Sequence, residues 1–214
     1  ILEAKARPDQ VWVSAFGSGF NKAFEQMQPL ITEAVTKSKK SIEDKVIDVT
    51  TGLEDIENGI LGYNSKEKFR EDPLRVYRVM QFIGRLGFTP TAELTELCKE
   101  IVQSGELDTL PKERVYEEFE KLLLKAEKPS LGLQWALGIG LIEKYFPELY
   151  KLKGVEQDVQ WHKEGDVWTH TMMALDAGAK LGASIGVYAE GFCDEEFVKK
   201  RQVVFMLGIL CHDL

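Results

Sequence analysis

Hydrophobic and polar residues recur with the period of an α-helix along most of the chain. Apolar positions three and four residues apart predict helices over 20–37, 73–86, 91–103, 111–127 and 167–182, and another at the C-terminal end. Residues 130–150 predict two short helices separated by glycine. The stretch VIDV, from Val46 to Val49, is the only convincing strand. The pattern therefore predicts a mainly α fold with a trace of strand near the N-terminus.

The helical pattern lapses around Leu152 to Gln160, which marks the best internal boundary. We expect three segments: an unassigned helical segment over 1–45, a helical array over 46–150, and a further helical domain over 151–214. At the start of the helix expected over 73–86, Asp72 and Pro73 are typical of an N-cap followed by proline at the first helical position.

The composition is typical of a globular protein and does not by itself identify the kind of molecule that the protein binds. The 214 residues carry a formal net charge of −8, and no apolar run reaches the roughly 20 residues that span a bilayer. Three widely spaced cysteines, an odd number, favour buried free thiols and a reducing, cytoplasmic location. The acidic balance does not exclude nucleic acid, because a local basic stripe can contact phosphates. The sequence leaves the oligomeric state open, and the missing initiator Met is typical of a trimmed chain.

The helix expected over 73–86 contains a narrow polar stripe, formed by Arg75, Arg78, Gln81 and Arg85. A solvated face explains such a stripe on spacing alone. Alternatively, Glu71 and Asp72 can project together with Arg75, because residues three or four apart on a helix are neighbours. A carboxylate accepts hydrogen bonds and a guanidinium only donates them, so the pair can bind the pairing edge of cytosine or adenine and reject uracil and guanine. Discrimination would be about 1–3 kcal/mol.

The stretch EDPLRVYRVMQFIGRLGF, residues 71–88, resembles the Glu-Asp-x-x-Arg motif of bacterial-type tRNA nucleotidyltransferases, the CCA-adding enzymes, and of related poly(A) polymerases. The resemblance implies that Asp72 and Arg75, supported by Glu71, select CTP or ATP, and that Arg78 and Arg85 contact tRNA. Residues 47–61, 113–124 and 140–176 resemble further blocks of the family in the same order. Residues 46–150 would then be its neck and body, in which Arg114 ties the bracing helix to the acidic entrance.

Residues 1–45 do not resemble an intact catalytic head of this family. Nucleotidyl transfer needs two metal ions, here Mg²⁺, held by acidic side chains. The sequence FGSGF offers the glycines of such a head, but no Asp-x-Asp follows and Arg-Arg-Asp is absent. Asp48 and Asp55 are read as structural. We therefore expect the head to be missing from this chain.

All three histidines lie in the last third of the chain, at His162, His170 and His212. His212 and Asp213 form a His-Asp dipeptide, and with His170 they resemble three of the four metal ligands of HD phosphohydrolases. Imidazole and carboxylate suit a divalent transition metal, which makes water a nucleophile for phosphoester cleavage. The fourth ligand, a later Asp, has no counterpart before Leu214, so residues 151–214 are expected to be the start of a truncated HD domain. His162 is open between a supporting role and plain surface.

Three functional hypotheses follow. The first is a fragment of a tRNA nucleotidyltransferase-like protein that recognises CTP, ATP and the tRNA 3′ end. The second is an HD-type metal-dependent phosphohydrolase, and the third is a non-catalytic RNA-binding remnant. The sequence leaves open whether C, A or both are added, and whether the parent is a CCA-adding enzyme or a poly(A) polymerase.

Overall fold

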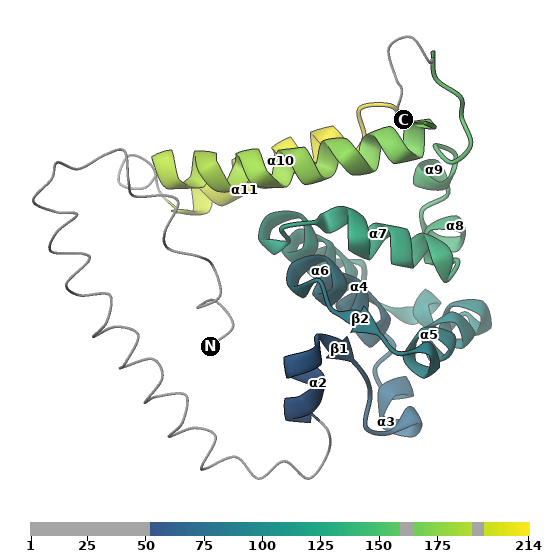
Figure 1. The fold of residues 1–214 in the computed structure, drawn as a ribbon. Coiled ribbons are helices and arrows are strands. Elements are labelled where there is room, and N and C mark those ends of the chain that lie inside the picture. Colours follow the sequence, from purple (N-terminus) through teal and green to yellow (C-terminus); the bar gives the residue numbers. More distant parts are fainter. Residues whose placement is uncertain (1–51, 159–164, 190–194) are drawn as a thin grey trace, which may run out of the picture. The chain divides into compact units, whose positions relative to one another are not determined.

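A computed structural model describes residues 52–158, 165–189 and 195–214, and this part is nearly all helical (Figure 1). The expected mainly α fold is therefore confirmed. The helices are α2 (Gly52–Asn58), α3 (Lys66–Arg70), α4 (Arg75–Leu86), α5 (Ala92–Ser104), η2 (Glu106–Thr109), α6 (Lys112–Lys125), α7 (Pro129–Gly138), α8 (Leu141–Tyr145), α9 (Pro147–Tyr150), α10 (Val167–Ala189) and α11 (Glu195–Leu210).

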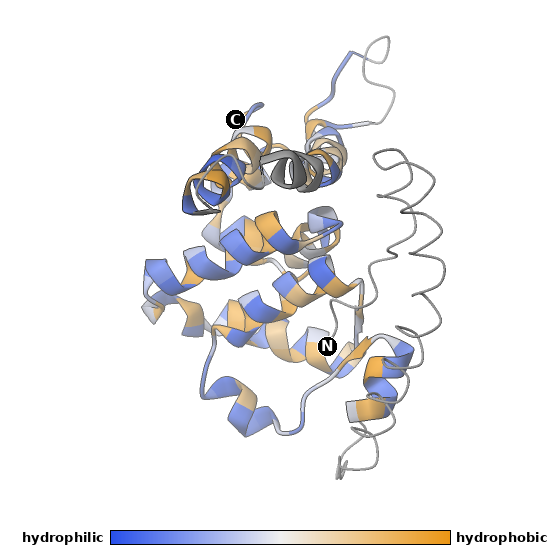
Figure 2. Ribbon diagram, turned by 90° about the vertical axis from the view of Figure 1, so that its left-hand side faces the viewer, coloured by the Kyte–Doolittle hydropathy of each residue, from blue (hydrophilic) through white to orange (hydrophobic). Residues whose placement is uncertain are grey.

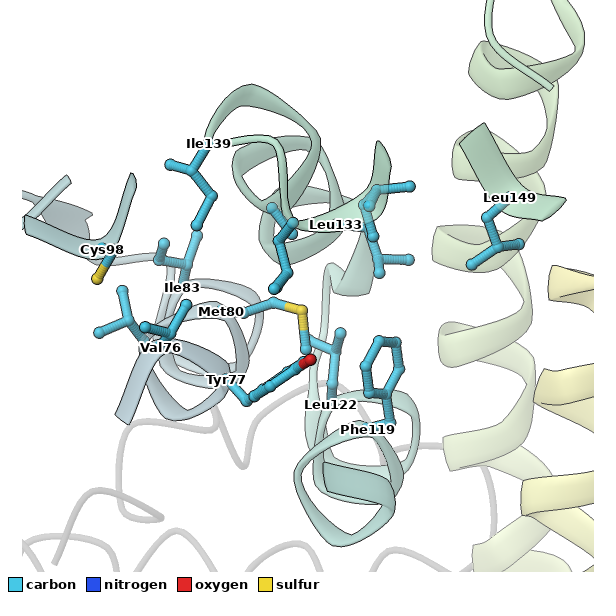
Figure 3. Packing of buried hydrophobic residues seen from close by; sticks show 14 of the residues in the cluster. Val76, Tyr77, Met80, Ile83, Cys98, Phe119, Leu122, Leu133, Ile139 and Leu149 are labelled. Atoms are coloured by element: carbon cyan, nitrogen blue, oxygen red, sulfur yellow. The ribbon is translucent and has the colours of Figure 1, made fainter. Parts of the chain in front are cut away.

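Helix α4 lies at the centre of the core. It packs against α6 and α7, and its residues Val76 and Met80 are completely buried (Figure 3). The close approach of α4 and α7 depends on Gly132, where a Cβ would lie 2.4 Å from the carbonyl oxygen of Met80. Most helices carry both hydrophobic and hydrophilic residues (Figure 2), and burial of their apolar faces is the main force that holds such an array together.

The two last helices, α10 and α11, run side by side and contact the central helices (Figure 1). Asp176 on α10 accepts hydrogen bonds from the backbone N–H and the hydroxyl of Ser130, at 3.1 and 2.7 Å, in the first turn of α7. Lys199 on α11 pairs with Glu120 on α6 at 2.8 Å. These contacts attach α10 to α7 and α11 to α6, the two helices that pack against α4.

Two short strands lie in the sequence on either side of α3 and α4. β1 (Ile60–Leu61) and β2 (Thr89–Pro90) pair in parallel, with Ile60 opposite Thr89 and Leu61 opposite Pro90. The strand expected at Val46–Val49 lies outside the described residues, as do the helix over 20–37, Asp48, His162 and Cys193. The sequence did not predict β1 and β2, because two-residue strands carry no periodicity of their own.

The prediction that Asp72 is the N-cap of the helix expected over 73–86, which the structure shows as α4, is wrong. The N-cap of α4 is Leu74, which makes no side-chain capping bond. The backbone forms a turn directly before the helix. The N–H of Arg75 donates to the Asp72 carbonyl at 3.0 Å, and the N–H of Val76 donates to the Pro73 carbonyl at 3.1 Å. The Asp72 carboxylate is therefore not used for capping. The helix ends as expected, at Gly87 with a left-handed φ of 65°.

Other expected elements differ in detail. Residues 130–150 form three helices, because the chain breaks at Gly140 and again before Pro147. The His-Asp dipeptide does not end a helix but lies in the turn after α11. Cys98 is buried as expected, whereas Cys211 is exposed. None of the described helices combines the length and apolar character that crossing a bilayer requires.

Candidate functional site

The Asp72 carboxylate faces a cation on another helix. Nη2 of Arg114, in the first turn of α6, lies 3.3 Å from Oδ1 and 3.4 Å from Oδ2. The Asp72 side chain is 28% exposed and that of Arg114 is 47% exposed, so the pair is partly open to solvent. The expected tie between the bracing helix and the acidic entrance is therefore present.

The Arg75 side chain has a different partner from the Asp72 side chain. Its Nη1 donates to the backbone carbonyl of Lys68, the third residue of α3. Within the described residues no side-chain hydrogen bond or ion pair joins Asp72 to Arg75. Glu71 is exposed and closes α3, where its backbone N–H donates to the Glu67 carbonyl at 3.2 Å. The three predicted residues thus lie together in sequence, while their side chains have separate partners.

The arginine stripe is interrupted at its centre. Gln81 is only 2% exposed, whereas Arg78 is exposed and Arg85 half-buried. With the Gln81 amide oriented to satisfy both groups, its oxygen accepts from Nη1 of Arg85 at 2.7 Å and from Nε at 3.2 Å. The Gln81 amide therefore holds the Arg85 guanidinium, and the buried Gln81 separates Arg85 from Arg75 and Arg78, so the stripe is not one continuous exposed face.

The three predicted metal ligands do converge. One ligand atom each from His170, His212 and Asp213 lies within 4.8 Å of the others, and the two imidazole rings are 5.4 Å apart between centroids. Nδ1 of His212 lies 2.6 Å from the Ile209 carbonyl, and in the neutral tautomer that donates this hydrogen bond, Nε2 carries the lone pair that a metal needs. Asp213 places Oδ2 3.2 Å from this Nε2. Two imidazoles and a carboxylate fit a divalent transition metal.

Asp166, which sequence reasoning missed, organises the start of α10. Its Oδ1 accepts from the backbone N–H and the hydroxyl of Thr169, at 2.9 and 2.6 Å, and its Oδ2 accepts from the Gly154 N–H at 2.7 Å. Partial burial raises the pKa of this carboxyl, but the hydrogen bonds outweigh burial and hold its pKa below the ordinary 3.8. The signal was an Asp three residues before a Thr at the start of an apolar run.

Comparison with known proteins finds one matching family model and a set of curated relatives. Residues 87–152 match the family described as "Probable RNA and SrmB-binding site of polymerase A". The Multifunctional CCA protein of Pasteurella multocida (strain Pm70) is 36% identical over 210 residues, covering 92% of this chain and 46% of that protein. The protein of the same name from Vibrio parahaemolyticus serotype O3:K6 (strain RIMD 2210633) is 35% identical over 179 residues, covering 81% and 44%.

Solved structures give a weaker likeness. A chain described as "tRNA-processing enzyme (apo form I)" has a TM-score of 0.44 and 21% identity, covering 74% of this chain and 46% of that one. A CCA-adding enzyme in complex with ATP has a TM-score of 0.44 and 16% identity, covering 78% and 51%. The chain spans about half the length of the curated relatives that it matches, at 44% and 46%.

Proposed function

The chain belongs to the family of CCA-adding enzymes and poly(A) polymerases, and we propose that it recognises CTP or ATP and the 3′ end of a tRNA for CCA addition. The observation that carries the proposal is the partly exposed Asp72 carboxylate, which pairs with Arg114 just before the start of α4. A carboxylate in that position is not needed for capping, so its environment suits a ligand.

Asp72 supplies the acceptor of the base-recognition pair. An ionised carboxylate has about four lone-pair sites, and a single nitrogen of Arg114 approaches both oxygens at 3.3 and 3.4 Å. These distances are long for a charge-assisted bond, which leaves acceptor capacity for the amino group of cytosine or adenine. Arg114 is therefore a positioning residue that neutralises Asp72 without saturating it.

Arg75 supplies the donor. One of its five N–H groups is directed to the Lys68 carbonyl, which fixes the guanidinium while the other N–H groups stay available. A donor from Arg75 to the ring nitrogen completes the pattern that cytosine and adenine share. Uracil and guanine, with the reverse order, would leave a donor or acceptor of the pair unmatched, and the discrimination expected from one bidentate base contact is about 1–3 kcal/mol.

Arg78 and Arg85 are proposed to contact the RNA backbone. Arg78 is the exposed cation, and Arg85 is held by Gln81 in a single orientation. Phosphate contacts of this kind give an affinity that falls steeply with salt.

The reaction of the whole protein would transfer CMP or AMP to the tRNA 3′ end. The 3′ hydroxyl attacks the α-phosphorus, a new phosphodiester bond forms, and pyrophosphate leaves. Metal ions, when bound in such an enzyme, neutralise the charge on the phosphates and activate the attacking oxygen. The required Asp-x-Asp pair does not occur in residues 1–45, and no step is assigned to residues of this chain beyond recognition.

Titration of the purified chain with a tRNA that lacks its 3′ CCA, beside an unstructured RNA of equal length, tests this proposal. We expect tighter binding of the tRNA, a steep loss of affinity with salt, and a weaker complex for Arg78→Ala and Arg85→Ala. Arg201→Ala, on α11, is the matched control and should bind as the unchanged chain does. Equal, weak binding to both RNAs would contradict the proposal. Tight tRNA binding with no incorporation of CTP or ATP would support a non-catalytic RNA-binding protein.

The convergence of His170, His212 and Asp213 supports a second candidate, a metal-dependent phosphohydrolase of the HD type. His212 and Asp213 would hold a divalent transition metal together with His170, and the metal would supply a nucleophilic hydroxide for phosphoester cleavage. Titration with Co²⁺, followed by its visible absorption, should show one site in the unchanged chain and none in His212→Ala. Metal binding together with cleavage of a cyclic or terminal phosphate would favour this function. If the chain shows neither property, only the first candidate function is left.

A further inference from the structure

A pocket of about 400 Å³ lies beside the base-recognition pair, between the segment that follows β1, helix α3 and one face of α4. Neither Asp72 nor Arg114 lines it. Arg75 and Arg78 both do, so the residue assigned to the nucleotide and one assigned to RNA meet in a single cavity. Its volume is in the range that holds a small ligand.

The charge of this pocket is opposite to that of the chain. Its lining contains the cations Lys68, Arg75 and Arg78 and no carboxylate, although the chain as a whole carries a net charge of −8. Within the described residues, neither the Lys68 ammonium nor the Arg78 guanidinium has a hydrogen-bond or ion-pair partner. One lining residue, Ser65, does donate to the exposed Glu67 at 2.7 Å. Two unpaired cations within one cavity are typical of a site for an anion.

The rest of the wall is aromatic and aliphatic. Tyr63 and Phe82 are half-buried, and the Tyr63 ring packs on the buried Phe69 with centroids 6.1 Å apart and planes inclined at 60°. The buried Phe69 thus supports the Tyr63 ring through a tilted contact. A simple phosphate site needs no such surface, whereas every nucleobase has a face that stacks on an aromatic ring.

We propose that this pocket holds one nucleotide unit, with the base against Tyr63 and Phe82 and the phosphate near Lys68 and Arg78. The proposal rests on the proposed function and adds to it a second subsite, beside the base edge read by Asp72. Two sources offer the same chemistry: a free nucleotide, or the last nucleotide of an RNA strand. Because Arg75 borders the pocket and is also the donor of the base-recognition pair, the subsite lies where an RNA end and an incoming nucleotide would meet.

The test measures binding of two probes to the purified chain: CTP by calorimetry, and a fluorescein-labelled pentaribonucleotide ending in CC by anisotropy. Tyr63→Ala should lower the affinity for the probe that occupies the pocket by about fivefold or more, the effect expected from the loss of one stacking contact. Tyr63→Phe, which keeps the ring, should bind nearly as the unchanged chain does. Lys68→Gln should weaken the same probe and reduce its salt slope by about one. The probe whose affinity these substitutions lower identifies the natural ligand: CTP indicates a free nucleotide, and the pentaribonucleotide indicates the end of an RNA strand.

Matched controls separate this subsite from general surface effects. Tyr116→Ala removes an exposed tyrosine on α6, and Lys99→Gln removes a cation that pairs with Glu96 on α5. Equal binding of Tyr63→Ala and Tyr116→Ala to both probes would overturn the subsite and leave the proposed function intact, because tRNA binding through Arg85 and base choice through Asp72 do not require Tyr63. Failure of the unchanged chain to bind either probe or tRNA would overturn both. Thermal unfolding of each variant verifies that it is folded.

Discussion

Arg114 and Asp72, 42 residues apart in the sequence, meet at the entrance of α4, where Nη2 lies 3.3 Å from Oδ1 and 3.4 Å from Oδ2. The pair joins the first turn of α6 to the turn before α4. Both helices are anchored in the same core, since Phe119 and Leu122 on α6 pack around Tyr77 and Met80 on α4 (Figure 3). The carboxylate is therefore presented from a rigid base.

Asp72→Asn should change base choice more than stability. The amide replaces one acceptor by a donor, so we expect the preference for CTP and ATP over UTP and GTP to fall by about tenfold, within the range of one bidentate base contact. Calorimetric titration with the four nucleotides measures this. An unchanged order of affinities would remove Asp72 from base selection.

Arg114→Ala should cost at most about 1 kcal/mol of unfolding free energy, because both partners are partly exposed to solvent. Its effect on CTP affinity should be larger than its effect on stability if the pair positions a ligand group. Urea unfolding measures the change in unfolding free energy, and CTP titration of the same protein preparation measures the change in affinity. Glu113→Ala, the exposed neighbour on α6, is the control and should alter neither quantity.

Asp176→Ala should destabilise the chain by about 1–3 kcal/mol. The substitution removes two hydrogen bonds to Ser130, which is 6% exposed, and leaves its backbone N–H in the first turn of α7 without this acceptor. Urea unfolding measures the loss. Glu148→Ala, an exposed carboxylate on α9, is the control, and an equal effect of the two would show that Asp176 does not link α10 to α7.

Gly132→Ala should be destabilising by about 1–3 kcal/mol, because its Cβ would lie 2.4 Å from a backbone oxygen of α4 that cannot rotate away. Gly138→Ala, in the same helix, has no atom within 4 Å of its Cβ. This control should be neutral or slightly stabilising, since alanine is the better helix former. Thermal unfolding of both variants makes the comparison, and equal shifts would contradict the close approach of α4 and α7.

Asp166 predicts a pH dependence of stability. Its pKa is held below 3.8 in the folded chain by the Thr169 and Gly154 hydrogen bonds, which outweigh the effect of burial. Between the two pKa values the unfolded chain binds more protons, so this contribution is fully present above about pH 4 and is lost as pH falls through the folded pKa. The destabilisation caused by Asp166→Ala should therefore be larger at pH 7 than at pH 3.

Urea unfolding of the unchanged chain and of Asp166→Ala at these two pH values checks this expectation. Glu156→Gln, an exposed carboxylate in the preceding loop, is the control for general acid effects. A difference that is the same at both pH values would mean that the carboxylate charge does not contribute.

Periodicity located most of the described helices, because helix α5 and helix α6 each bury one apolar face while local signals mark their ends. Thr91 accepts from the Leu94 N–H at 3.1 Å at the start of α5, and Gly105 ends it with a φ of 82°. Such signals act within four residues and can be read from the chain. The two-residue strands could not, because each strand forms only by pairing with the other. The break before α9 falls at Pro147 and is a local signal that the sequence prediction did not use.

What the sequence determined by itself was chemical: which residues accept, which donate, and which can bind a metal. It identified Asp72, Arg75 and the trio His170, His212 and Asp213 by type and order. Only the tertiary structure decided which of these share a site. Packing of α10 against α11 brings the trio within 4.8 Å, whereas α6 and α3 give Asp72 and Arg75 separate partners. The physical reason is that side-chain convergence follows from the burial of helix faces far apart in the chain, and no local pattern encodes it.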